Sequence, residues 1–158
     1  MEHIINITDR IPLESVKRWQ RTMAEMLSGY TEKTGLEVQF PANDYGPVLS
    51  TGIEFSSLCE HHLMPFFGKI DVGYLPKNKI CGLSKIARTV KAFSRRLQLQ
   101  ERLTLQIANE INKGLDPIGE FVKITAFHTC QGCRGVEKRA EMVTLKTIGK
   151  WKEIKELC

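Results

Sequence analysis

The sequence FVKITAFHTC, at residues 121–130, decides the fold prediction because apolar and polar side chains alternate along it. Successive side chains of a strand point to opposite faces, so Val122 and Ile124 share one face with His128 and Cys130. The stretch therefore predicts a half-buried strand that carries an imidazole and a thiol on the same side.

The segments around this strand predict an α+β fold. Apolar residues recur every three or four positions in some segments, which predicts helices, and alternate in others, which predicts strands. The expected helices cover about 13–30, 84–97 and 100–114, and the other expected strands cover about 48–56, 66–75 and 142–148. After the first helix the order is β-β-α-α-β-β, which favours an antiparallel sheet with a helical pair on one face. The edges of such a small sheet need cover, and pairing with other subunits is one way to provide it.

Length and composition predict one globular domain. The chain has 158 residues, of which 42% are hydrophobic and 26% charged, so disordered, collagen-like and coiled-coil classes are excluded. We expect neither a membrane span nor a signal peptide at Met1–Asn6. The net charge of +5 is typical either of an inert basic surface or of a protein with an anionic partner.

Cysteine and histidine gather at two places in the sequence, which indicates a metal site. CEHH at residues 59–62 places a thiol and an imidazole three residues apart, and HTC at 128–130 adds a second pair. Sulfur and imidazole ligands favour zinc over magnesium or calcium. Cys59, His62 and Cys130 would form an open catalytic site, where zinc lowers the pKa of water toward ~7.

The other members of these two motifs leave an alternative open. His61 and His128 would serve in proton transfer at an open site, because histidine titrates near neutral pH. Cys133, however, forms a C-x-x-C motif with Cys130. A closed site with Cys133 as fourth ligand would be structural, and spacing alone does not decide between the two.

Basic side chains form a candidate anion site. Ser84, Lys85 and Arg88 open an expected helix, where backbone N–H groups and the helix dipole favour negative charge, and Arg134 follows the second metal motif. The alternative is that they are solvated surface charges, which is how we interpret the other basic residues of the two helices, Arg102 included. Neither a P-loop nor a dinucleotide-binding motif is present.

Gln100 and Glu101 lie at the junction of the two expected helices. A carboxylate there would accept hydrogen bonds from adjacent N–H groups of a purine such as guanine. The alternative is an acid that merely stabilises the start of its helix.

Four motifs in order give the chain a resemblance to the GTP cyclohydrolase I family. They are LCEHHLMPFFGK at 58–69, GLSKIAR at 82–88, RRLQLQERLT at 95–104 and HTCQGCRGV at 128–136. The resemblance covers roughly residues 15–151 and implies the tunnelling fold, in which sheets join across subunits into barrels. It also favours the open zinc site over the closed one.

The resemblance implies a role for each motif residue. Cys59, His62 and Cys130 would bind Zn2+, and His61 and His128 would transfer protons. The implied substrate-binding residues are Ser84, Lys85, Arg88 and Arg134 for the triphosphate, Gln100 and Glu101 for guanine, and Arg18, supplied to a neighbouring subunit's site.

The implied reaction converts GTP into 7,8-dihydroneopterin triphosphate. Water adds to C8, the imidazole ring opens, formate leaves, and the ribose rearranges before the new ring closes. Folate, pterin and deazaguanine synthesis share this step. The implied protein is a cytoplasmic homo-oligomer, commonly a decamer, with sites at subunit interfaces and no nucleic-acid or membrane partner. We expect one domain over 1–158: a helix and loop at 1–46, a catalytic core at 47–151 and a tail at 152–158.

Two other functions remain open. One is another enzyme of the same fold, of the nitrile reductase type, which uses a cysteine nucleophile and NADPH. The other is a zinc module that binds nucleic acid, although the sequence lacks an aromatic and basic stripe. The chain also departs from the family pattern: Val16 stands for a usual Pro, Cys133 for a common Met and Leu145 for a usual Ser. These departures bear on assembly and regulation more than on chemistry.

Overall fold

The computed structural model describes residues 11–151. The expected tail at 152–158 and the segment Met1–Asn6 lie outside this part of the chain. The helices are α1 (Leu13–Met26), the 3-10 helix η2 (Ser28–Tyr30), α2 (Leu83–Ser94), α3 (Gln100–Leu115) and α4 (Thr129–Gly132). The strands are β1 (Gln39–Pro41), β2 (Val48–Cys59), β3 (Pro65–Leu75), β4 (Lys79–Cys81), β5 (Leu97–Gln98), β6 (Gly119–His128) and β7 (Glu141–Gly149). None of the helices within residues 11–151 has the length and apolar character needed to cross a membrane.

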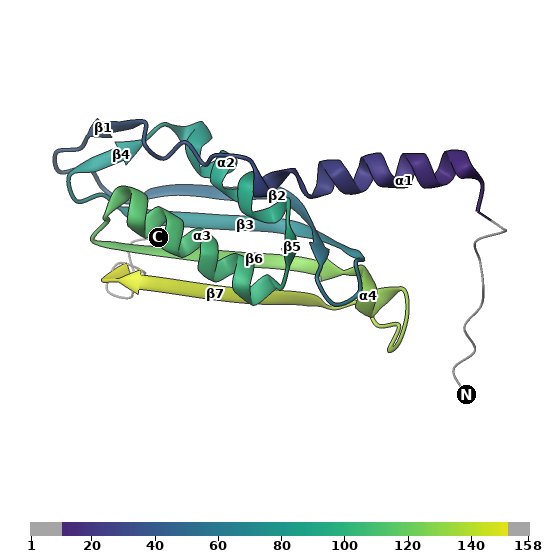
Figure 1. The fold of residues 1–158 in the computed structure, drawn as a ribbon. Coiled ribbons are helices and arrows are strands. Elements are labelled where there is room, and N and C mark those ends of the chain that lie inside the picture. Colours follow the sequence, from purple (N-terminus) through teal and green to yellow (C-terminus); the bar gives the residue numbers. More distant parts are fainter. Residues whose placement is uncertain (1–10, 152–158) are drawn as a thin grey trace.

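Five strands form one sheet in the order β5-β2-β3-β6-β7 (Figure 1). Strands β2, β3, β6 and β7 pair antiparallel with their neighbours, whereas the short β5 pairs parallel with β2 and sets Gln98 beside Cys59. Strands β1 and β4 form a separate two-stranded ribbon. The predicted α+β class with an antiparallel sheet is confirmed.

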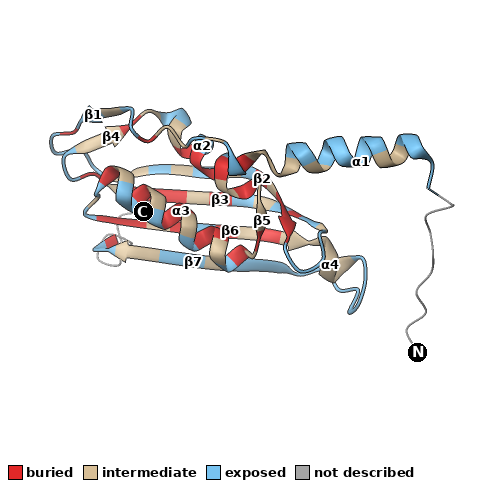
Figure 2. Cartoon of the chain, viewed as in Figure 1, coloured by how far each residue is buried: buried red, intermediate tan, exposed pale blue. Residues whose placement is uncertain are grey.

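Helices α2 and α3 cover one face of the sheet, and the core lies between the two layers (Figure 1). The predicted alternation within β6 is confirmed, because Val122 and Ile124 are fully buried whereas Lys123 is exposed. Leu103 and Ile107 of α3 pack into the same core. Figure 2 shows the buried residues along the facing sides of the helices and strands.

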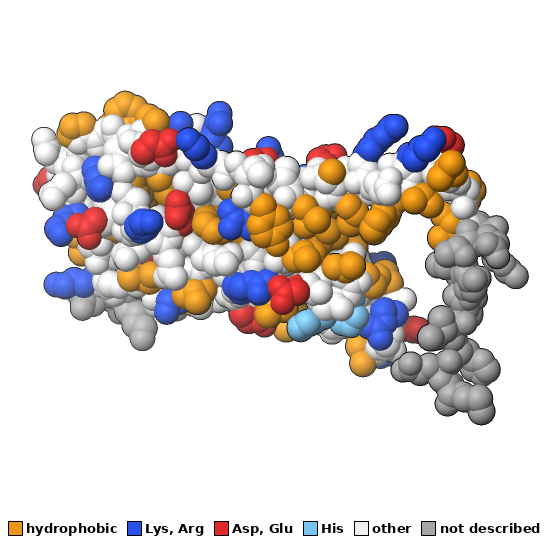
Figure 3. All heavy atoms as spheres, viewed as in Figure 1, with side chains coloured by type: hydrophobic (Ala, Val, Ile, Leu, Met, Phe, Trp, Pro, Cys, Tyr) orange, Lys and Arg blue, Asp and Glu red, His pale blue; other side chains and the backbone are white. Residues whose placement is uncertain are grey.

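Exposed apolar side chains lie away from this core, on the sheet and on α1. Phe67, Val143 and Leu145 of the sheet are exposed, as are Leu13 and Trp19 of α1. Helix α1 extends away from the sheet and buries none of its residues, and hydrophobic side chains gather along its lower side (Figures 1 and 3). Apolar surface of this kind is typical of a protein–protein interface.

The ends of two strands differ from the prediction at the metal motifs. Strand β2 continues to Cys59, beyond its expected end at residue 56. Strand β6 ends at His128, so the placement of Cys130 on the strand is wrong. The reason is that the last pair between β3 and β6 joins Phe66 to His128, and the chain beyond it closes a helical turn, α4, instead.

Candidate active site

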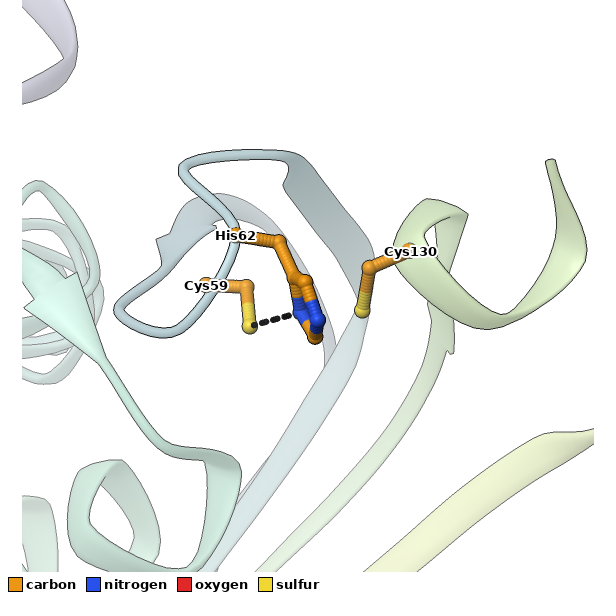
Figure 4. Close-up of side chains that lie close together, drawn as sticks. All are labelled: Cys59, His62 and Cys130. Carbon is orange, nitrogen blue, oxygen red and sulfur yellow. Dashed lines mark hydrogen bonds between the residues drawn. The ribbon is translucent and has the colours of Figure 1, made fainter. Parts of the chain in front are cut away.

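Cys59, His62 and Cys130 form a cluster at one end of the sheet (Figure 4). Cys59 is the last residue of β2, His62 lies in the turn that follows, and Cys130 belongs to α4. One ligand atom from each residue lies within 4.8 Å of the others, and Cys59 Sγ is 3.8 Å from His62 Nδ1. Two segments about 70 residues apart in sequence thus bring their side chains to one point.

The turn after β2 is closed by backbone hydrogen bonds that aim His62 back at Cys59. The N–H of Leu63 donates to the carbonyl of Cys59 at 2.8 Å, and the N–H of Cys59 donates to the carbonyl of Met64 at 2.8 Å. Leu63 takes up a left-handed conformation with φ of 53°. Such a conformation is disfavoured for leucine, so the tight turn is held by these bonds.

The donor set of the cluster fits a zinc ion. Two sulfur atoms and one imidazole nitrogen are the soft and borderline ligands that zinc prefers. Burial raises the pKa of the Cys130 thiol, and the nearby Cys59 sulfur raises it further. Two adjacent thiolates are therefore unfavourable without a cation between them, which is the charge that a metal ion supplies. Three ligands leave a fourth zinc position open.

Cys133 is not a member of this cluster. It is the exposed C-cap residue of α4, whereas Cys130, which begins the C-x-x-C motif, is half-buried. The structure therefore has the three-residue arrangement of an open site and not the four-residue arrangement that Cys133 would complete.

His128 lies beside the cluster in a defined orientation. Its ring stacks on Phe66 with 4.5 Å between centroids and 4° between planes. His128 Nε2 lies 2.8 Å from Gln100 Oε1. Burial lowers the pKa of His128, and the negative charge of Glu101 opposes this shift. The imidazole is thus held in place, and its lowered pKa favours the neutral form near pH 7.

Gln100 determines which nitrogen of His128 carries the hydrogen. The side-chain amide nitrogen of Gln100 donates to the carbonyls of Ile124 and Met142 at 3.2 and 2.9 Å and to Thr144 Oγ1 at 3.1 Å. Its oxygen must therefore face His128, so the imidazole donates from Nε2. The ring nitrogen left for chemistry is Nδ1. Gln100 thus has internal partners, which nothing in the sequence indicated.

An ion pair borders the cluster. Arg102 donates to the carboxylate of Glu60, and it also donates to Gln98 Oε1 at 3.1 Å and to the carbonyl of Leu97 at 2.9 Å. The interpretation of Arg102 as a solvated helix charge is therefore wrong. Because these bonds link α3 and β5 to the turn after β2, Arg102 stabilises the segment that carries His62.

A pocket of about 230 Å³ brings most of the predicted chemical residues together. The sequence-predicted residues that line it are Cys59, His61, His62, Gln100, Glu101, His128 and Cys130. Among its other lining residues are Leu99, Met142 and Thr144. Sequence reasoning missed Met142 and Thr144 because only the tertiary structure brings β7 beside the start of α3. His61 is exposed, and its ring lies edge-on to that of His62 at 6.1 Å.

The predicted phosphate-binding residues do not line this pocket in a single chain. Ser84, Lys85 and Arg88 lie in the first turns of α2, whose other end leads to β5 and the cluster. At 1.5 Å per residue, roughly 15 Å of helix separates the two ends. Arg134, in the loop after α4, and Arg18, on α1, are exposed and also lie outside the pocket lining.

The fold and the site together define a class. The protein is an α+β protein whose pocket contains a Cys-His-Cys group that could hold a metal ion, beside an oriented histidine and a carboxylate. The family model of GTP cyclohydrolase I matches residues 6–157. The chain belongs to the GTP cyclohydrolase I family and is an enzyme of that family.

Two GTP cyclohydrolases from bacteria are similar to this chain over most of its length. GTP cyclohydrolase 1 of Parabacteroides distasonis is 46% identical over 136 residues, which cover 84% of this chain and 69% of the relative. GTP cyclohydrolase 1 of Leptospira biflexa is 53% identical over 114 residues, or 72% of this chain and 62% of the relative. Among solved structures, the apo form of the archaeosine synthase QueF-Like gives a TM-score of 0.49 at 16% identity, covering 66% of this chain and 96% of that one.

Proposed function

We propose that this enzyme converts GTP into 7,8-dihydroneopterin triphosphate and releases formate, with zinc held by Cys59, His62 and Cys130. The observation that carries the proposal is the pocket in which this cluster, His128 and Glu101 meet. A zinc ion there would supply a Lewis acid that activates water for attack on a purine carbon. The chain's own residues would bind, orient and protonate the substrate.

His128 is the proposed proton-transfer residue. Its Nε2–H is engaged by Gln100, so the free Nδ1 would first accept a proton from the attacking water and then give that proton to the purine ring nitrogen as the ring opens. Stacking on Phe66 restricts the imidazole to one plane. His61, exposed at the mouth of the pocket, would exchange protons with solvent.

Glu101 is the residue proposed to recognise guanine. It is the second residue of α3, exposed within the pocket, and its carboxylate would accept hydrogen bonds from adjacent N–H groups of the base. Gln100 would contribute through His128, because its amide already bonds to β6 and β7. Ser84, Lys85, Arg88 and Arg134 would bind the phosphates.

We propose further that the complete site forms between subunits of a homo-oligomer, a decamer by family resemblance. The pocket of about 230 Å³ is smaller than the roughly 300–1,000 Å³ typical of ligand sites. The proposed phosphate-binding residues lie elsewhere on the chain, and α1 with Arg18 extends away from the sheet (Figure 1). Neighbouring copies would bring these parts together, with the sheets continuing across subunits as a barrel and each chain acting as one domain.

The experiment is incubation of the purified protein with GTP and zinc, followed by mass detection of formate and of a fluorescent pterin. We expect both products, in equal amounts and dependent on zinc. NADPH consumption without pterin formation would favour the nitrile reductase alternative. Salt-dependent binding to RNA or DNA without turnover of GTP would favour the nucleic-acid-binding alternative.

A further inference from the structure

The C-x-x-C motif places two free cysteines on one helical turn. Cys130 lies inside α4, and Cys133 caps it with φ of −99° and ψ of −10°, while its N–H donates to the carbonyl of Thr129 at 2.8 Å. Residues three apart on a helical turn have Cβ atoms about 5–6 Å apart. Their Cα atoms, at a similar spacing, fall within the roughly 4.4–6.8 Å that a disulfide spans, but the Cβ atoms must approach to roughly 3.5–4.5 Å, so the turn has to tighten by about 1–2 Å.

The turn that carries the two cysteines is anchored to the sheet. Thr129 Oγ1 donates to the carbonyl of Pro65 at 2.6 Å. A side chain on Gly132 would overlap the ring of Phe127, so this glycine lets the turn pack directly on β6. The two thiols are therefore presented by a fixed segment and not by a loose loop.

The three cysteines around the cluster differ in their exposure. Cys59 is buried, with 6% of its surface exposed, and Cys130 is intermediate, whereas Cys133 is exposed. A water-soluble oxidant therefore meets the Cys133 thiol first. Cys133 is outside the ligand cluster, so it stays available while Cys59 and Cys130 bind a metal.

We propose that Cys130 and Cys133 form a redox-sensitive pair. A hydroperoxide oxidises the pair to a disulfide, and the metal is released because Cys130 no longer binds it. The Cys133 thiolate attacks the peroxide and becomes a sulfenic acid, releasing one molecule of water or alcohol. The Cys130 thiolate then attacks that sulfur, the S–S bond forms, and the oxygen leaves as water. Two thiols are oxidised and one peroxide is reduced. The metal-release step rests on the proposed zinc site.

The test uses the zinc-loaded protein and hydrogen peroxide, with zinc release followed by a chromogenic chelator. In wild type, we expect zinc to be released and the tryptic peptide 124–134, which contains both cysteines, to lose the mass of two hydrogens. A dithiol reductant should reverse both changes. In Cys133→Ser, we expect zinc release to slow roughly ten-fold. Cys81→Ser removes a buried cysteine on β4 and should behave as wild type.

Three outcomes would overturn the proposal: wild-type zinc release in Cys133→Ser, a wild-type disulfide that joins Cys59 to Cys130, or equal slowing in Cys81→Ser. The metal assignment is tested separately by the zinc content before peroxide is added. Protein that binds no zinc refutes that assignment, while the mass of peptide 124–134 after oxidation still decides whether Cys130 and Cys133 pair.

Discussion

His128 is the residue whose surroundings say most about the chemistry. Phe66 restricts its plane, and Gln100 fixes its hydrogen on Nε2. Neither neighbour is a member of the Cys-His-Cys cluster. The residue proposed to transfer protons is therefore held independently of the residues proposed to bind the metal, and substitutions can distinguish the two roles.

We predict that His128→Ala keeps zinc and loses product formation. Removal of a general acid or base lowers turnover by roughly 10²- to 10⁴-fold, while the three ligands remain intact. Zinc content by atomic emission and formate release by mass spectrometry measure the two effects. Cys130→Ala is the control, because it should lose zinc and product together. Formate release by His128→Ala at the wild-type rate would contradict its role.

At the scale of elements, the pairing of β3 with β6 positions the site. This pairing runs from Leu75 and Gly119 to Phe66 and His128, so it determines where His128 lies along the sheet. Two residues in these strands have unusual packing. Gly68 of β3 lies against the backbone of β6, and Glu120 of β6 is a fully buried carboxyl group.

We predict that Gly68→Ala destabilises the protein. A Cβ atom at this position would overlap the carbonyl oxygen of Thr125, and backbone atoms of a paired strand cannot move aside as a side chain does. The free energy of unfolding should fall by about 3 kcal/mol, the upper end for overpacking in a core. Denaturant unfolding measures the change. Gly46→Ala, where a Cβ meets nothing within 4 Å, should match wild type; equal stability of the two variants would contradict the prediction.

We predict that Glu120 makes stability depend on pH. Its carboxyl oxygens have no hydrogen-bond partner among the described residues, and burial raises its pKa from 4.5 to about 8. The folded state therefore retains a proton that the unfolded state loses, so stability is greatest below pH 4.5 and falls as pH rises toward 8. At pH 7 the free energy of unfolding is therefore lower by about 3 kcal/mol than it is below pH 4.5.

The measurement for Glu120 is the free energy of unfolding from pH 5 to pH 8, obtained by linear extrapolation from denaturant unfolding. Glu120→Gln stays neutral throughout this range. Its free energy of unfolding should therefore change less with pH and should exceed that of wild type near pH 8. Glu141→Gln, at an exposed strand residue, should follow wild type. Parallel profiles for Glu120→Gln and wild type would refute the effect.

The surface of the whole molecule favours association with other copies of the chain. Exposed apolar side chains lie on the sheet and on α1, whose residues make little contact with the rest of the chain (Figure 2). The pocket is small, and the basic residues predicted to bind phosphate lie outside it. The catalytic unit that we propose is therefore a ring of chains, in which α1 supplies Arg18 to a neighbour.

We predict that Arg18→Ala and His128→Ala restore each other when coexpressed. Each variant alone should be nearly inactive, but a mixed oligomer contains sites with an intact His128 and an intact neighbouring Arg18. Random assembly gives roughly a quarter of the wild-type activity. Light scattering confirms assembly, and Arg21→Ala on the same helix is the control with normal activity. Assembled but inactive mixtures would show that Arg18 does not act across subunits.

Much of the fold followed from local sequence patterns. The 121–130 alternation predicted β6, although the helical turn at Cys130 was missed because the strand ends where its partner β3 ends. The three residues of the Cys-His-Cys cluster were all named from two short motifs. The partners of Gln100 and the ion pair of Arg102 were not, because they join segments whose relative positions depend on the sheet register.

The sequence by itself determined the order of the main helices and strands, the residue types of the Cys-His-Cys cluster and the family, because periodicity and motifs are properties of neighbouring residues. Only the tertiary structure showed Cys59, His62 and Cys130 together with Cys133 outside, as the resemblance had implied, and only it showed that Gln100 orients His128. It also left Lys85 and Arg88 outside the pocket. These outcomes depend on strand pairing and helix packing over tens of residues, where burial of the common core determines which side chains come into contact.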